Sequence, residues 1–180
     1  MRNLARILLI IALTLPLGAC WQANYALFYV KDSAMPDVAG VWLLEKKSYS
    51  ASGLRMPETF RLSPARQGGF TMVSLETGKK APGDEVVFIP LSGVSAYLLG
   101  TRTSKGNSGE HWVYNLLRVE GNDAWMVEGR CSKSAVIAGI SGDGTSCSAA
   151  HGTPLLAAAY DQLSKPNAWA SALHMQRISR

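Results

Sequence analysis

Residues 112–128 read WVYNLLRVEGNDAWMVE, and this stretch is the strongest strand signal in the chain. Apolar side chains fall on both sides of its first half: Trp112, Tyr114 and Leu116 on one side, and Val113, Leu117 and Val119 on the other. Gly121-Asn122-Asp123 is a turn signal, after which alternation resumes with Trp125 and Val127. The stretch therefore predicts two antiparallel strands joined by a tight turn.

Shorter apolar runs precede it at intervals of roughly ten residues, which is typical of an antiparallel meander. They cover residues 41–49, 59–62, 70–75, 85–90 and 94–101. The glycines within 64–69 favour a hairpin, which would place Phe60, Leu62, Phe70 and Met72 on one buried face. The last two runs are apolar at nearly every position, as in strands covered on both faces. We expect a mainly β protein whose seven-stranded meander forms a small barrel, a half-barrel or a sandwich.

A late helix and a closing strand complete the predicted domain. Thr153 and Pro154 suit the N-cap and first position of a helix that Pro166 ends. Its predicted packing stripe consists of Leu156, Ala159, Tyr160 and Leu163. Residues 171–178 then predict a C-terminal strand, although Asn167 is also a possible cap for a second short helix.

The N-terminus has the anatomy of an export signal. Arg2 and Arg6 precede an apolar stretch, 7–17, that is too short to span a bilayer as a helix. Leu17-Gly18-Ala19-Cys20 resembles the bacterial lipobox. That resemblance implies cleavage before Cys20, a thioether lipid on its sulfur and an acyl group such as palmitate on the new amino terminus. The alternative is an ordinary secretory signal that is cleaved elsewhere.

A lipidated Cys20 would make this an envelope lipoprotein. Two or three acyl chains, at roughly 0.8 kcal/mol per buried methylene, give a stable membrane tether. Trp21 differs from the aspartate that resembles an inner-membrane retention signal, so we expect the outer membrane, facing the periplasm. The predicted organisation is a signal peptide over 1–19, the lipidated cysteine and a linker over 20–38, and one β-rich domain over 39–180. Aromatic residues within 25–29 either rest on the membrane or fold back on the domain.

The basic charge is partly a property of the signal peptide. The whole chain carries +5, from 18 basic and 13 acidic residues. Loss of residues 1–19 removes Arg2 and Arg6 but no acidic residue, which leaves 16 basic residues and a charge of about +3. We therefore expect no nucleic-acid partner, and interpret Lys46-Lys47 and Lys79-Lys80 as solvated positions.

The two remaining cysteines, Cys131 and Cys147, are expected to form a disulfide in an oxidising compartment. The 15-residue loop 132–146 would then contribute about 3 kcal/mol by the chain-entropy model. A metal site with Cys147 and His151 is the alternative, but these ligands do not complete a zinc set. The glycine-rich segment 138–145 lacks the lysine of a P-loop and the spacing of a nucleophile elbow, so it predicts a surface loop.

Gly40-Val41-Trp42 on the first strand of the meander, the late helix and the final strand are similar to the order of elements in lipocalins. The resemblance rests on a three-residue motif and on element order. The lipocalin barrel has eight strands, against seven predicted here before the helix. The resemblance implies that Trp42 plugs one end of a barrel and packs near a basic side chain, for which Arg177 is the candidate.

The sequence does not favour an enzyme, a metal or a cofactor. His111, His151 and His174 are isolated, and no paired motif accompanies them. Two non-catalytic classes remain. The preferred one is an interaction module that docks an envelope partner, because large side chains would fill the barrel: Phe60, Phe70, Phe88, Trp112 and Trp125. The alternative is a lipocalin-like carrier of a small apolar or amphipathic ligand.

Overall fold

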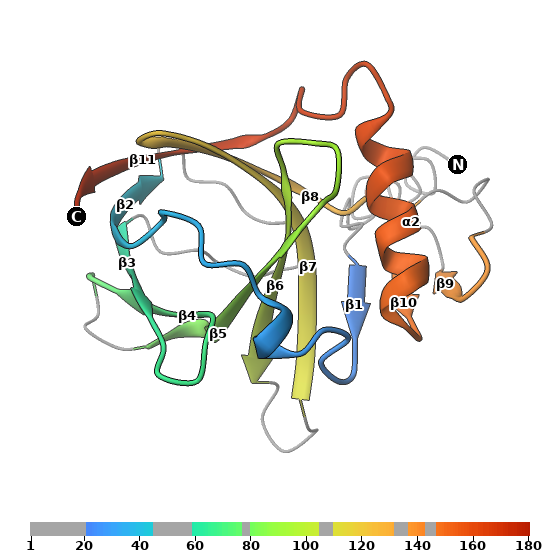
Figure 1. Ribbon diagram of the computed structural model, residues 1–180, viewed down its shortest axis with the longest axis horizontal. Coiled ribbons are helices and arrows are strands. Elements are labelled where there is room, and N and C mark those ends of the chain that lie inside the picture. Colours follow the sequence, from blue (N-terminus) through green and yellow to red (C-terminus); the bar gives the residue numbers. More distant parts are fainter. Residues whose placement is uncertain (1–20, 45–58, 77–79, 105–109, 132–136, 143–146) are drawn as a thin grey trace, which may run out of the picture.

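The computed structural model describes residues 21–44, 59–76, 80–104, 110–131, 137–142 and 147–180. These residues form a mainly β protein with a closed antiparallel barrel, three further strands and helix α2 (Gly152–Leu163) (Figure 1). The barrel strands are β2 (Gly40–Leu44), β3 (Thr59–Pro64), β4 (Phe70–Ser74), β5 (Lys80–Pro90), β6 (Tyr97–Ser104), β7 (Glu110–Glu120), β8 (Asp123–Glu128) and β11 (Leu173–Ser179). The remaining elements are β1 (Trp21–Ala23), η1 (Val30–Asp32), β9 (Ile140–Gly142) and β10 (Cys147–Ala149).

The C-terminal strand closes the barrel. Each strand from β2 to β8 pairs antiparallel with the next, and β11 pairs with both β8 and β2. Gln176, for example, lies opposite Leu43 on one edge and Asp123 on the other. The predicted strand over 171–178 is thus confirmed, and the alternative helix capped by Asn167 is wrong. The eighth strand comes after the helix, so the meander and β11 together make a closed barrel rather than a half-barrel or sandwich.

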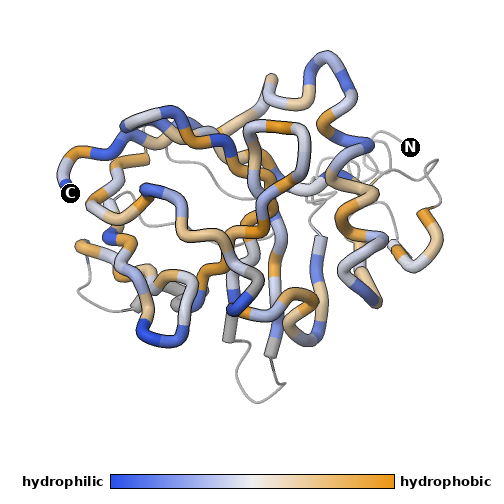
Figure 2. The backbone as a smooth tube through the Cα atoms, in the orientation of Figure 1, coloured by the Kyte–Doolittle hydropathy of each residue, from blue (hydrophilic) through white to orange (hydrophobic). Residues whose placement is uncertain are grey.

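The barrel wall is buried on both sides, which makes two hydrophobic cores. On β5, Val86 and Phe88 face the interior, whereas Val87 and Ile89 belong to a second core outside the wall. That outer core fills the space between the wall and the elements β1, β10 and α2. Apolar residues accordingly recur along the barrel strands and on α2 in Figure 2. The prediction of strands covered on both faces is confirmed.

Two of the five aromatic residues expected to fill the barrel lie outside it. Trp112 belongs to the outer core, and Trp125 lies on the outer wall with its ring stacked on His174 at 5.2 Å. Alternation along β7 and β8 instead turns Val113 and Ala124 toward the interior. Phe60, Phe70 and Phe88 do face inward. Small inward residues therefore leave room beside β7 and β8.

Helix α2 is confirmed, but it is rotated relative to the predicted stripe. It begins at Gly152 with His151 at the N-cap, not Thr153. Its buried residues are Leu155, Ala158, Ala159 and Gln162, whereas Tyr160 is 38 % exposed. The Gln162 amide binds the backbone where β8 ends, accepting from Arg130 N at 2.8 Å and donating to Glu128 O at 3.0 Å. These hydrogen bonds set the inward face of the helix.

The segment expected to be a linker belongs to the folded domain. β1 pairs antiparallel with β7 and parallel with β10, and Trp21 is only 1 % exposed. Further along, the Phe28 ring meets the Tyr114 ring edge-on at 6.0 Å, and Leu27 N donates to the Tyr114 hydroxyl. The boundary at residue 39 is therefore wrong, because the buried Trp21 and the partly buried Phe28 tie the segment to the outer core. Of the two alternatives for residues 25–29, folding back on the domain is confirmed for Leu27 and Phe28, whereas Tyr29 is 72 % exposed.

Candidate functional site

One end of the barrel is built around Trp42. The indole Nε1 donates to Val38 O at 2.8 Å, and the Arg177 guanidinium lies 5.5 Å from the ring centroid. Gly40, which opens the Gly-x-Trp motif, has φ of +135°. A Cβ there would overlap the Ser179 carbonyl, so this position requires glycine. The predicted contact between Trp42 and Arg177 is confirmed.

Arg177 ties three parts of the chain together at this end. Its side chain is 2 % exposed. The guanidinium donates to Asp37 O at 2.9 Å, to Gly121 O at 3.0 Å and to Asn122 Oδ1 at 3.1 Å. A hydrogen bond and the charge from Arg177, with the charge of Arg180, hold the pKa of the Asp37 carboxyl below its usual value. Arg177 therefore fixes the segment before β2 to the turn between β7 and β8.

The same segment crosses the end of the barrel. Phe88 N donates to Ser33 Oγ at 3.0 Å, and Ala34 N donates to Phe88 O at 2.7 Å. Val38 is 1 % exposed beneath it. In Figure 1 the segment passes in front of the barrel interior. We call this closed side, built from Trp42, Val38 and Arg177, the Trp42 end.

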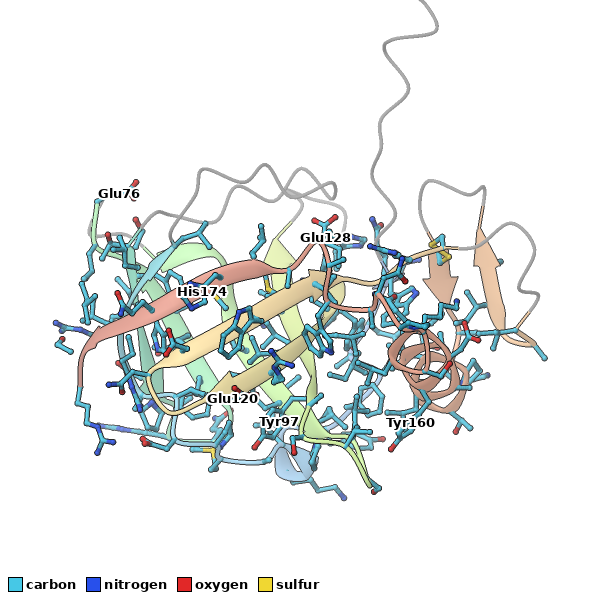
Figure 3. All side chains as sticks on the ribbon, turned by 90° about the horizontal axis from the view of Figure 1, so that it is seen from above. Glu76, Tyr97, Glu120, Glu128, Tyr160 and His174 are labelled. Carbon is cyan, nitrogen blue, oxygen red and sulfur yellow. A yellow bond between two sulfur atoms is a disulfide. The ribbon has the colours of Figure 1, made fainter. Side chains whose placement is uncertain are left out.

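The opposite side is where β2, β4 and β8 finish and where β3 starts. Thr59 N donates to Glu76 Oε1 at 3.2 Å there. Figure 3 shows Glu76 and Glu128 on this side, with Tyr97 and Glu120 on the other. We call it the Glu76 end, defined by Leu44, Thr59, Glu76 and Glu128. Strand pairs β2–β3, β4–β5 and β6–β7 are connected at this end through residues outside those described.

A cavity of about 50 Å³ lies inside the barrel. Its lining is apolar apart from Thr101 and Asn115: Val38, Trp42, Phe60, Leu62, Met72, Val86, Phe88, Leu99, Val113, Leu117, Val119, Ala124, Met126 and Met175. Asn115 is 9 % exposed, and its Oδ1 has no hydrogen-bond partner among the residues that the structure describes. Ser74 Oγ, on the inward face of β4, is also buried and finds no partner within the described part of the chain. A buried, unpaired acceptor is costly to the folded protein, so Asn115 is the polar feature that requires an explanation.

The cavity matches a small or slender apolar group. Since a water molecule occupies about 30 Å³ of liquid, the observed volume holds only a few heavy atoms. Three of the lining residues are methionines, Met72, Met126 and Met175. Methionine side chains are unbranched and change rotamer readily, so they enlarge a cavity at low cost. The Asn115 oxygen would accept a hydrogen bond from a hydroxyl or amide on such a ligand.

A second, wider depression of about 400 Å³ lies between β1, β9 and β10. Its lining includes Asn24, Tyr25, Ile140 and Ser148, and it opens broadly to solvent. The Tyr25 hydroxyl at its edge donates to Ala150 O. Because it surrounds little of any bound molecule, this depression offers less apolar contact than the barrel interior.

The other predicted site residues have separate outcomes. Cys131 and Cys147 form a disulfide with Cα atoms 5.7 Å apart, so the predicted pairing is confirmed and a metal site using the Cys147 thiol is wrong. His174 Nε2 lies 2.8 Å from Asp123 Oδ1, and His151 is the N-cap of α2. No group of three or more His, Cys, Asp or Glu side chains is placed to hold a metal ion in the part of the chain described. Cys20 lies outside the described residues.

The comparisons with known proteins give no relative. No family model, no curated protein and no solved structure matches the chain. Among the residues that the structure describes, no helix is both long enough and apolar enough to cross a bilayer.

Proposed function

We propose that this protein is a non-catalytic, lipid-anchored envelope protein whose barrel binds a small apolar or amphipathic molecule. The observation that carries the binding proposal is Asn115 Oδ1, which has no partner in the described ranges and faces an apolar cavity that Trp42 closes at one end. If this position served only packing, an apolar side chain would fill it without a buried, unpaired acceptor. The order of elements and the Trp42–Arg177 contact add support, since both resemble lipocalins.

The anchor is proposed from Leu17-Gly18-Ala19-Cys20, with acylation of Cys20 and an outer-membrane location facing the periplasm. Intact mass of the protein extracted from membranes tests it directly. An acylated mass beginning at Cys20 is expected. A mass that starts at another residue, or that lacks acyl groups, would refute the anchor.

Binding is tested by NMR titration with 1-butanol as the probe, because the cavity holds only a few heavy atoms, and with native mass spectrometry for any co-purifying molecule. Ala124→Val adds two carbon atoms to the cavity lining on β8, where Ala124 is 2 % exposed. We expect it to weaken probe binding about tenfold, which corresponds to ~1.4 kcal/mol. Ala26→Val, at an exposed position, is the matched control. Equal affinity in the wild type and both variants, or no binding at all, would contradict the proposal.

A second candidate, docking of an envelope protein, is favoured by one surface feature. The Arg118 guanidinium lies 4.7 Å from the Trp125 ring and 5.3 Å from the Trp169 ring, and His174 stacks on the other side of Trp125. Tryptophan and arginine are enriched in binding hot spots. Loss of a specific envelope cross-link in Trp125→Ala, with probe binding retained, would support this candidate.

A further inference from the structure

We propose that the Glu76 end of the barrel faces the membrane in the acylated protein. The inference rests on the acylated Cys20 of the proposed function. The inference adds an orientation of the domain relative to the membrane, because the paired strand β1 begins at Trp21, the residue directly after Cys20. Cys20 is covalently joined to Trp21, and consecutive Cα atoms are about 3.8 Å apart.

The register of β1 places Trp21 at the Glu76 end. β7 is longer than its neighbour β8, which pairs only with the part of β7 from Asn115 onward. β1 occupies the same edge of β7 just beyond, with Trp21 opposite Tyr114 and Ala23 opposite Trp112. Trp21 is therefore level with Glu128, the last residue of β8, which lies opposite Asn115.

Side-chain contacts hold Trp21 in this place. The indole Nε1 donates to Arg130 O at 3.2 Å. The ring packs against Gly129, where any Cβ would overlap it. Gly129 and Arg130 directly follow β8, on the side where Figure 3 shows Glu128. Two strands, a buried indole and a required glycine thus fix the point at which a lipid on Cys20 would attach.

The Trp42 end lies on the far side of the barrel from this point. A strand rises about 3.3 Å per residue, so the two ends of the eight-residue strand β6 are roughly 25 Å apart along the strand. Turning the Trp42 end toward the membrane would require β1 to detach from β7 and β10. The attachment point and the Glu76 end therefore lie on one side of the molecule.

The test compares two exposed glutamates that Figure 3 shows on opposite sides, Glu76 and Glu120. Glu76→Cys and Glu120→Cys proteins, acylated and labelled with the same fluorophore, are reconstituted in phosphatidylethanolamine and phosphatidylglycerol vesicles carrying a nitroxide on a fraction of the headgroups. The expected result is a larger loss of fluorescence at position 76 than at position 120.

A matched control separates the attachment point from other effects. A flexible ten-residue Gly-Ser insertion between Cys20 and Trp21 has a root-mean-square span of about 18 Å. It is expected to reduce the difference between positions 76 and 120 while leaving the barrel unchanged by circular dichroism. Equal loss at both positions in the directly anchored protein, or greater loss at position 120, would overturn the orientation.

Intact mass distinguishes failure of the orientation from failure of the proposed function. Protein that is acylated but equally quenched at both positions overturns the orientation alone. Protein that lacks acyl groups overturns the anchor and, with it, the orientation. Probe binding to the barrel is measured separately, so neither result decides the binding proposal.

Discussion

Replacement of Arg177 by methionine is the strongest test of how the Trp42 end holds the barrel together. The variant keeps an unbranched apolar side chain but removes every donor from a guanidinium whose side chain is 2 % exposed. It leaves Gly121 O and Asp37 O without their hydrogen bonds and removes the cation from above the Trp42 ring. The chain would also lose the hydrogen bonds from the guanidinium to Asn122 Oδ1 and to the Asp37 carboxylate at the same site.

The magnitude follows from the number and burial of these contacts. Each hydrogen bond to a buried charged group contributes about 1.5–3 kcal/mol, but bonds within one network do not add fully. The Asp37 carboxylate is 67 % exposed, so solvent screens its ion pair and it adds little. Loss of one partner from a buried charged network typically costs about 3–5 kcal/mol. We expect that loss, and a fall in Tm of about 6–20 °C for a domain of this size.

Urea unfolding followed by tryptophan fluorescence and circular dichroism measures the change. Arg102→Met is the matched control, because Arg102 pairs with Glu85 on the surface, with the arginine side chain 36 % exposed. The control is expected to lose less than about 1 kcal/mol. If the free energy of unfolding falls no more in Arg177→Met than in Arg102→Met, the reasoning about the Trp42 end is wrong.

Three further predictions concern other parts of the molecule. Burial raises the pKa of Tyr114 to about 12, and the hydrogen bond from Leu27 N partly offsets this rise. The stability that the protonated Tyr114 hydroxyl contributes should be present below pH ~10 and should decline as pH rises toward 12. Urea unfolding at each pH should show a smaller decline for Tyr114→Phe than for the wild type. Thiol labelling of the unfolded, oxidised protein should detect neither Cys131 nor Cys147, and labelling of both would contradict the pairing. Replacement of both cysteines by serine should lower the free energy of unfolding in urea by about 3 kcal/mol. Asn115→Leu should raise the free energy of unfolding by about 1–3 kcal/mol, because it removes a buried side-chain oxygen for which the described residues provide no partner. The same variant should bind hydroxyl-bearing ligands more weakly. A fall in the free energy of unfolding would show that the amide has a hydrogen-bond partner in the wild type.

The sequence predicted the parts of the fold that depend on local alternation. Strands β3 to β8 and β11 follow from runs in which apolar residues recur at every second position. The same alternation predicts which side chains share a face of each strand. Closure of the barrel was left open, because the eighth strand is separated from the seventh by the helix and a crosslinked loop. The contact between Trp42 and Arg177 was available only through the resemblance to lipocalins.

Non-local pairing accounts for what the sequence did not predict. β1 has only three residues, and its partners on β7 and β10 lie far along the chain, so no local periodicity marks it. Trp112 and Trp125 lie on strands whose two faces are both covered. The size of a side chain does not show which of these faces lies inside the barrel, so the outward positions of the two tryptophans were not predicted. Asn115 did leave a signal, since it interrupts the inward series Val113, Leu117 and Val119 with a polar residue.

The burial of Trp21 also has a consequence for the order of events in making the protein. Trp21 hydrogen-bonds to a carbonyl 109 residues later in the chain, and β1 pairs with strands that follow it at similar distances. β1 therefore cannot be fixed until most of the chain has been synthesised. Enzymes that cleave before Cys20 and acylate it would need this stretch extended and accessible, so maturation at Cys20 would come first and the docking of Trp21 last.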